Sequence, residues 1–299
     1  MSLRLPLPRG RFLELEPFAV MGIVNATPDS FYAPSRHRAL EARDEALAME
    51  ASGAAIVDIG GESTRPGSDY VGLEEELERV VPVVEAIRKL SDLPISVDTR
   101  KSEVARAALD AGADVINDVS ALMHDPEMAR LAAQRGVPVV LMHMLGDPKT
   151  MQAAPSYVDC PAEVRAFLLS AAGRAQAAGI ARDRVLLDPG IGFGKRLEDN
   201  LALIARLDEL AALGYPMVVG LSRKAFVGAI TARPPEGRLS GSIAAALAAH
   251  ARGARMFRVH DVAETRDALA VFVAIANAAG NAGDESCGDS APSNGLGLR

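Results

Sequence analysis

The chain has 299 residues and carries 32 Lys and Arg against 39 Asp and Glu, which gives a formal net charge of −7. This acidic balance, without any run rich in Lys or Arg, argues against a nucleic-acid-binding protein. No apolar stretch approaches the roughly 20 residues that span a bilayer. Residues 1–10 lack the apolar segment of a secretory leader, and two cysteines are too few for a disulfide framework. We therefore expect a soluble cytoplasmic protein that binds neither nucleic acid nor membranes.

Eight short apolar runs recur along the chain, and each is followed by a polar residue. Because the runs are continuously apolar and not alternating, they are typical of parallel strands that are buried on both sides. In chain order they are Ala19–Val24 before Asn25, Ala54–Val57 before Asp58, Pro94–Val97 before Asp98, Asp114–Ile116 before Asn117, Val137–Met142 before His143, Val185–Leu187 before Asp188, Met217–Leu221 before Ser222, and Met256–Val259 before His260.

Each run is followed by a segment that we predict to be helical. The predicted helices are Ala39–Ser52, Leu73–Leu90, Ser102–Ala111, Asp125–Arg135, Pro161–Ala178, Leu197–Leu213, Gly241–Arg252 and Val262–Ala279. Seven of the eight are followed directly by a glycine, the residue that most easily adopts the left-handed conformation ending a helix.

Strands that alternate with helices in this way predict an α/β protein with a parallel sheet. An open, doubly wound sheet would normally gather its ligand-binding residues at one switch point, whereas here a polar residue follows every strand. We therefore predict a single (β/α)8 TIM barrel over residues 1–280, with its active site at the C-terminal ends of the strands. Residues 281–299, which are rich in Gly, Ser and Asn, are predicted to form a disordered tail.

Four of the polar residues form one candidate binding set. Asp98, Asn117 and Asp188 follow three strands and should face each other across the barrel mouth, with Asp58 from a fourth strand beside them. Carboxylate oxygens accept hydrogen bonds, and an amide both donates and accepts, so this set suits a ring with a guanidine-like edge. The alternative for any one of these carboxylates is a structural salt bridge inside the barrel.

Cations also gather at or just after the strand ends, although the protein is acidic. They are Arg65, Arg100, Lys101, Arg223, Lys224 and Arg258. Such a cluster suggests an anionic ligand, and the alternative, solvated loop charges, remains open for Arg100 and Lys101.

Three further strand-end residues have distinct expectations. Alternation along the last strand places His260 on the same side as Arg258, where the pair could grip a diphosphate. The amide oxygen of Asn25 could hold Mg²⁺ together with phosphate oxygens and waters. His143, which lies alone after an apolar run, is more typical of a structural histidine.

The motifs together resemble one known family, the bacterial dihydropteroate synthases, over residues 19–279. The resemblance is carried by Met21–Phe31, Asp58–Gly67, Ser96–Thr99, Gly112–Asp118, Leu141–Met144, Asp188–Lys195, Gly220–Lys224 and Arg258–Val262. It implies a pterin-binding TIM barrel that joins (7,8-dihydropterin-6-yl)methyl diphosphate to 4-aminobenzoate in folate biosynthesis. Members of this family are sulfonamide targets and typically homodimers, and they use Mg²⁺.

The resemblance also implies roles for individual residues. The pterin ring would be held by Asp98, Asn117, Asp188 and Lys224, with Asp58 among the substrate-binding carboxylates. The diphosphate and Mg²⁺ would be held by Arg258, His260 and Asn25, with Asn25 as the metal ligand. The 4-aminobenzoate would contact Thr64, Arg65, Pro66, Phe193 and Ser222. The catalytic set would be Asn25, Asp98, Lys224, Arg258 and His260.

The chain departs from the family in its first loop, where Tyr32-Ala33-Pro34-Ser35 replaces the usual Ser-Asp-Gly-Gly. Pro34 stiffens a segment that glycines would leave loose. Two other functions therefore stay open at this point. One is a pterin-binding paralogue without catalysis, and the other is a pterin-dependent methyltransferase, which would have no use for a diphosphate site.

Overall fold

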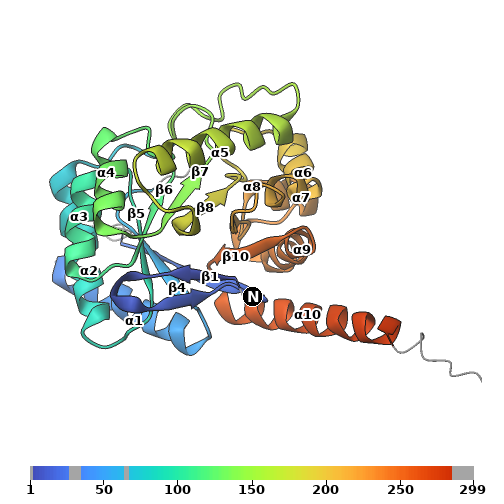
Figure 1. Cartoon of the computed structure of the whole chain (residues 1–299), viewed down its shortest axis with the longest axis horizontal. Coiled ribbons are helices and arrows are strands. Elements are labelled where there is room, and N and C mark those ends of the chain that lie inside the picture. The colour runs from blue at the N-terminus through green and yellow to red at the C-terminus, as the bar shows by residue number, and fades with distance from the viewer. Residues whose placement is uncertain (1–2, 27–34, 64–66, 285–299) are drawn as a thin grey trace, which may run out of the picture.

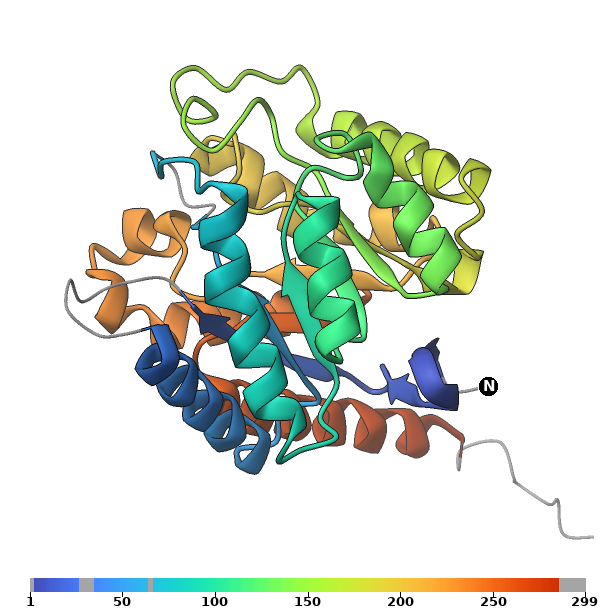
Figure 2. The same ribbon diagram turned by 90° about the vertical axis from the view of Figure 1, so that its left-hand side faces the viewer.

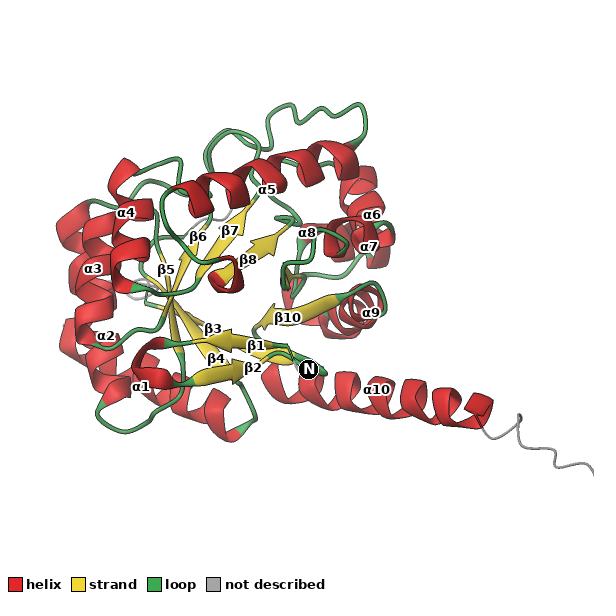
Figure 3. Ribbon diagram, viewed as in Figure 1, coloured by secondary structure: helices red, strands yellow, loops and turns green. Residues whose placement is uncertain are grey.

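The computed structural model describes residues 3–26, 35–63 and 67–284, in which eight parallel strands close into a barrel surrounded by helices (Figure 1). Around the barrel the strands follow the order β10-β3-β4-β5-β6-β7-β8-β9, so chain neighbours are also neighbours in space. This arrangement confirms the predicted TIM barrel. Figure 3 shows the strands inside and the helices outside.

The barrel strands are β3 (Ala19–Asn25), β4 (Ile56–Gly60), β5 (Ile95–Asp98), β6 (Val115–Asp118), β7 (Val139–Met142), β8 (Val185–Asp188), β9 (Met217–Gly220) and β10 (Ala254–Val259). The helices are α1 (Ser35–Ala51), α2 (Leu73–Arg88), α3 (Ser102–Ala111), α4 (Pro126–Arg135), α5 (Cys160–Ala177), α6 (Leu197–Ala205), α7 (Leu207–Ala211), α8 (Ala225–Thr231), α9 (Leu239–His250) and α10 (Val262–Asp284).

Alternation along the strands divides the barrel interior into two layers, because every second side chain points inward. At the amino-terminal end the inward side chains form one apolar cluster that contains Ala19, Met21, Ile56, Val115, Val140, Leu186, Val218 and Met256. Two residues further along four of these strands, the inward side chains are Asp58, Asn117, Asp188 and Arg258. The residues between them face outward into the larger core that the helices cover. The polar layer therefore lies at the carboxyl ends of the strands.

A hairpin that the strand and helix pattern did not predict closes the amino-terminal end of the barrel. Strands β1 (Arg4–Pro6) and β2 (Phe12–Glu14) pair antiparallel and are joined by the 3-10 turn η1 (Pro8–Gly10). Its leucines, Leu5, Leu7, Leu13 and Leu15, are buried in the apolar cluster inside the barrel. The hairpin thus seals the end of the barrel that lies opposite the polar layer.

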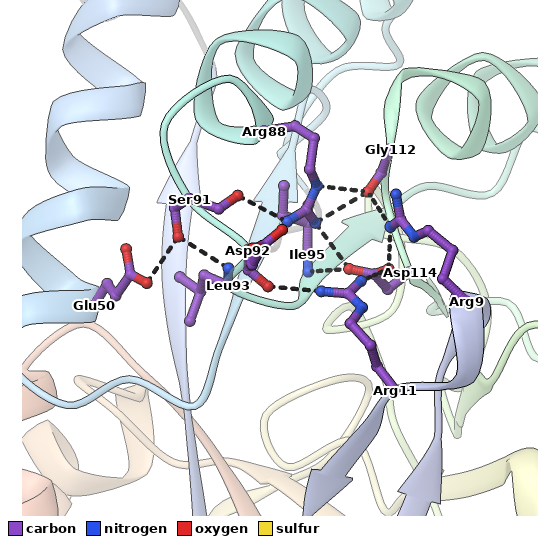
Figure 4. Close-up of polar contacts among 10 residues, drawn as sticks. All are labelled: Arg9, Arg11, Glu50, Arg88, Ser91, Asp92, Leu93, Ile95, Gly112 and Asp114. Atoms are coloured by element: carbon purple, nitrogen blue, oxygen red, sulfur yellow. Dashed lines mark hydrogen bonds and ion pairs between the residues drawn. The ribbon is translucent and has the colours of Figure 1, made fainter.

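A buried carboxylate fixes this hairpin to the barrel (Figure 4). Asp114, which precedes β6, is fully buried and accepts hydrogen bonds from three arginines. Arg9 Nη2 lies 2.7 Å from Oδ1, Arg11 Nη2 contacts the same oxygen, and Arg88 Nη2 lies 2.9 Å from Oδ2. The backbone N–H of Ile95 donates to Oδ2 at 3.0 Å. Two of the three arginines come from the hairpin, so Asp114 links it to α2 and β5.

Some predicted element bounds were wrong. Strand β4 runs two residues past Asp58, so Asp58 is an internal strand residue and not a terminal one. The single helix expected over Leu197–Leu213 is broken at Arg206, whose φ of −116° and ψ of 27° are not helical. The Arg206 side chain donates to Asp159 at 2.9 Å, at the amino end of α5. Helix α8 was not predicted.

Helix α10 extends further than expected. It runs to Asp284, past the predicted end at Ala279 and into the segment that we expected to be disordered from residue 281. The rest of that segment, residues 285–299, lies outside the described residues. Both views show α10 leaving the barrel and projecting beyond it (Figures 1 and 2). Among the residues described, no helix is both long and apolar enough to cross a membrane.

We predict that Asp114→Ala lowers the free energy of unfolding by roughly 3–5 kcal/mol, because it leaves the mostly buried guanidinium of Arg88 without its counter-charge and the buried N–H of Ile95 without its acceptor. Asp92→Ala is the matched control, since exposed Asp92 accepts from Arg11 Nη1 through its backbone carbonyl at 2.6 Å. It should change stability by no more than about 0.5 kcal/mol. Urea denaturation followed by circular dichroism measures both values. Equal losses in the two variants would contradict this role of Asp114.

Candidate active site

Arg258 on β10 lies between two carboxylates in the polar layer. Its Nε donates to Asp58 Oδ2 at 2.6 Å, and its Nη2 donates to Asp98 Oδ2 at 3.0 Å. Asn117 Nδ2 donates to the same Asp58 oxygen at 3.0 Å. The structure therefore brings together Asp58, Asp98, Asn117 and Arg258 from four different strands. Arg258 was expected to lie beside a diphosphate. In the structure it contacts two of the carboxylates that were expected to surround the pterin ring.

Exposure distinguishes Asp58 from the other members of this layer. Asp98, Asn117 and Asp188 each keep 6% of their surface exposed, whereas Asp58 has none. A ligand that enters the mouth can therefore reach the first three but has no surface of Asp58 to contact. This corrects the expectation that Asp58 binds substrate directly. The cause is its position in β4, one inward position deeper than the end of the strand.

The charges of the polar layer influence one another. Burial raises the pKa of Asp98 to about 8, with Arg258 opposing the shift and Asp58 adding to it. Burial also raises the pKa of Asp188, against a hydrogen bond from Gly190 N at 2.7 Å. Burial alone would lower the pKa of Arg258, but the facing carboxylates outweigh it and the pKa is raised. Carboxylates exceed cations here, which favours a ligand that donates hydrogen bonds.

Lys224 lies over the loop that follows β8. Its Nζ is 4.1 Å from the centre of the Phe193 ring, a cation–π contact, and its charge opposes the raised pKa of Asp188. Gly192 in the same loop has a φ of +85°, and a Cβ there would lie 3.2 Å from Lys224 Cδ. The loop after β8 and the segment after β9 therefore place an aromatic face and a cation side by side, where the cation acts on the carboxylate of Asp188.

Ser222 and His260 form a second polar pair. Ser222 Oγ lies 3.0 Å from His260 Nδ1 and accepts from the His260 backbone N–H at 3.3 Å. The hydroxyl can donate to Nδ1 or accept from it, depending on the tautomer of the ring. In the tautomer with the proton on Nε2, Ser222 donates to Nδ1 and Nε2 is a donor suited to an anionic oxygen.

Besides Arg258, three of the candidate cations are paired with carboxylates. Arg100 Nη2 lies 2.6 Å from Glu62 Oε1, and Lys101 Nζ lies 2.7 Å from Glu62 Oε2 and also contacts Glu76. All four side chains are buried, so these charges are structural and not solvated as the alternative had supposed. Likewise, Arg223 pairs with Asp261. Glu62 and Glu76 carry no strand-end signal and were not predicted.

A buried lysine beneath the loop after β8 was also not predicted. Lys195 Nζ donates to the carbonyls of Gly190 and Phe193 at 2.9 and 3.1 Å and lies 2.9 Å from His143 Nδ1. Burial lowers the pKa of Lys195 to about 7, and burial together with Lys195 lowers that of His143 to about 3. His143 is thus a neutral structural histidine. The sequence feature that could have indicated this lysine is its position directly after the short glycine-rich segment Gly190–Gly194.

The remaining candidates lie at the rim or beyond the described residues. Asn25 ends β3, is exposed, and pairs in register with Gly60 of β4. Its amide is therefore available at the mouth. The segment of Thr64, Arg65 and Pro66 lies outside the described residues, as do residues 27–34, which contain most of the first-loop departure.

Known proteins are similar to this chain in both sequence and fold. The model of the family described as pterin binding enzyme matches residues 21–260. The dihydropteroate synthase of Escherichia coli strain K12 is 48% identical over 274 residues, covering 91% of this chain and 97% of that protein. The Xanthomonas albilineans enzyme solved with 4-aminobenzoic acid has a TM-score of 0.86 at 50% identity, covering 92% of this chain and 99% of that one.

The chain belongs to the dihydropteroate synthase family of pterin-binding enzymes. It is a transferase of folate synthesis that forms dihydropteroate. A further member, from Yersinia pestis and solved in complex with a sulfonamide drug, has a TM-score of 0.86 at 45% identity and covers 93% of this chain and 100% of that one.

We predict that Asp98 makes stability depend on pH. Its pKa is raised on folding to about 8, so the folded state holds this proton more tightly than the unfolded chain. The stabilisation is complete below the ordinary Asp pKa of about 4 and is lost as pH rises through about 8. The unfolding free energy of wild type relative to Asp98→Asn should therefore fall steadily from about pH 5 to about pH 9. A difference that is constant over this range would contradict the raised pKa.

Proposed function

We propose that the polar layer and its rim join (7,8-dihydropterin-6-yl)methyl diphosphate to 4-aminobenzoate, with release of pyrophosphate. The observation that carries this assignment is the group formed by Asp58, Asp98, Asn117 and Arg258, with Asp188 in the same inward layer. A pterin presents N–H donors along a guanidine-like edge. The side-chain oxygens of Asp98, Asn117 and Asp188, residues that each keep 6% of their surface exposed, supply the acceptors that this edge requires.

The reaction exchanges one bond for another at the methylene carbon of the pterin. The arylamine nitrogen forms a bond to this carbon, the carbon–oxygen bond breaks, and its electron pair leaves with the diphosphate. The amine then releases a proton to solvent. An arylamine is neutral near pH 7, so the step needs no strong base. Arg258 and the Nε2–H of His260 stabilise the negative charge that develops on the leaving oxygen.

The opposite charge develops on the pterin methylene. The carboxylates around the pterin ring stabilise positive charge there. Lys224, which lies over Phe193, holds the pterin ring on that side of the site. On the 4-aminobenzoate side we place Phe193 and Ser222, together with Thr64, Arg65 and Pro66. Ser222 holds His260 at 3.0 Å, which connects the 4-aminobenzoate side to the diphosphate side.

Mg²⁺ fits this site only together with the diphosphate. Among the described residues, no group of three or more His, Cys, Asp or Glu side chains could hold a metal by itself. The exposed amide oxygen of Asn25 is one hard ligand, and Mg²⁺ commonly takes few protein ligands alongside phosphate oxygens and waters. When bound, the ion would neutralise charge on the departing diphosphate. Asn25 would orient it.

The direct test is pyrophosphate release by the purified protein from the two substrates with Mg²⁺. We expect release that depends on both substrates and stops when EDTA removes Mg²⁺. Arg258→Ala should lower kcat/KM for the pterin substrate by more than about tenfold, or about 1.4 kcal/mol, because it removes charge stabilisation at the leaving group. The KM for 4-aminobenzoate should change far less.

Arg255→Ala is the matched control for this variant. Arg255 lies on the same strand at an intervening position, and its side chain donates to the carbonyl of Ala254 at 2.9 Å. Its loss should leave kcat/KM within about threefold of wild type. A change within threefold for Arg258→Ala would refute the assignment of Arg258. Pterin binding without pyrophosphate release would instead identify a non-catalytic paralogue.

We also propose that the protein is a cytoplasmic homodimer. The low number of cysteines, with Cys160 a free buried thiol, supports the location. Support for the dimer comes from α10, where Val271 and Ile275 are one turn apart and keep 59% and 65% of their surface exposed. Apolar side chains exposed side by side in this way suit a contact between two copies.

Sedimentation velocity tests the dimer. Wild type should sediment as a dimer, and the double variant Val271→Glu/Ile275→Glu as a monomer, because the added charges would be buried unpaired in the interface. The control is Leu90→Glu, which adds one charge at an exposed apolar residue elsewhere on the surface. Leu90 lies just after α2 and is 62% exposed. A monomeric wild type, or a double variant that remains dimeric, would rule out this interface.

A further inference from the structure

We infer that Asp58 is the positioning residue of the reaction, the fixed anchor that holds Arg258 in place for the leaving diphosphate. This inference rests on the proposed function, because that function assigns Arg258 to the diphosphate and Asp98 to the pterin ring. It gives a role to a carboxylate that no entering ligand can touch.

The contacts of Asp58 all lead to other members of the site. One oxygen, Oδ2, accepts from Arg258 Nε at 2.6 Å and from Asn117 Nδ2 at 3.0 Å. The other oxygen, Oδ1, is buried and has no hydrogen-bond partner among the described residues. A single oxygen therefore sets the orientation of a cation from β10 and of an amide from β6.

Asp58 lies deeper in the barrel than the residues that a ligand reaches. It is fully buried, and in register it lies beside Ile23 of β3 and Ser96 of β5, one inward position below Asp98. The next inward residue of its own strand is Gly60, which places no side chain between Asp58 and the mouth. Arg258 can thus reach down to Asp58 while its side chain remains 23% exposed.

Because only Asp98 keeps exposed surface, the two carboxylates that bind Arg258, Asp58 and Asp98, have different functions. Asp98 keeps an exposed edge and bonds to Nη2 at 3.0 Å, so it can exchange this contact for the N–H groups of a pterin. Asp58 cannot make that exchange. When Asp98 turns to the ring, Nε of Arg258 stays bound to Asp58, and the Nη groups become available to phosphate oxygens. Binding of the ring and orientation of the leaving group are thereby coupled.

A double-mutant cycle tests this coupling, with kcat/KM for the pterin diphosphate measured by pyrophosphate release. We expect Asp58→Asn to lower kcat/KM by about tenfold or more and to leave the KM for 4-aminobenzoate within about threefold. In the Arg258→Ala background, the same change should lower kcat/KM by less than about threefold, because its effect passes through Arg258.

The matched control is Asp199→Asn. Asp199 is also a buried carboxylate that bonds an arginine, with Arg196 Nε at 2.8 Å, but it lies on α6 and Arg196 is outside the polar layer. The Asp199→Asn variant should be less stable than wild type but keep kcat/KM within about threefold. If Asp58→Asn does not fold, Asp58→Ser takes its place in the cycle, since a hydroxyl still accepts one hydrogen bond.

Three outcomes would overturn the inference. One is an Asp58 variant with wild-type kcat/KM, and another is a double variant whose loss equals the product of the two single losses. The third is an equal loss in Asp199→Asn, which would indicate a general effect on folding. Pyrophosphate release by wild type is measured first, so failure of the proposed function is seen separately, as a wild type without turnover.

Discussion

The period of two along a β-strand is the constraint from which the site follows. In a closed barrel one set of alternate side chains must point inward, and each strand is long enough for only a few inward positions. In this protein the lower inward positions are apolar and are sealed by the hairpin leucines. The upper ones carry Asp58, Asn117, Asp188 and Arg258. A shift of one residue in any of these strands would exchange a site residue for a core residue.

Charge balance within the polar layer is the second constraint. Buried carboxylates are tolerated when cations and hydrogen-bond donors face them, and here Arg258 serves Asp58 and Asp98 together. At the other end of the barrel the proportions are reversed, with three arginines on Asp114. The arginine-rich end is closed by the hairpin and supports the fold. The carboxylate-rich end keeps exposed edges and is left for ligands.

Much of this could be predicted from sequence because it depends on local periodicity. The barrel follows from eight repeated units, and α3 has the predicted bounds of Ser102–Ala111. The depth of Asp58 could not be predicted, because strand ends shift by two residues and burial depends on the neighbouring strands. The pairing of Lys101, just before α3, with Glu62 after β4 and Glu76 on α2 joins separate elements and has no local signal. The hairpin did carry a local signal, the alternating Leu5, Leu7, Leu13 and Leu15, but this alternation differs from the continuous apolar runs of the buried parallel strands.

The polar layer is arranged for binding at the expense of stability. Burial raises the pKa values of Asp98 and Asp188, which means that folding disfavours their charged forms. A ring edge with several N–H donors relieves this penalty when it enters, because it solvates the carboxylates that the barrel has desolvated. In the proposed function, folding thereby supplies part of the free energy with which the pterin binds. The same relief would free Arg258 from Asp98, so one redistribution of hydrogen bonds would both recognise the ring and prepare the leaving-group site.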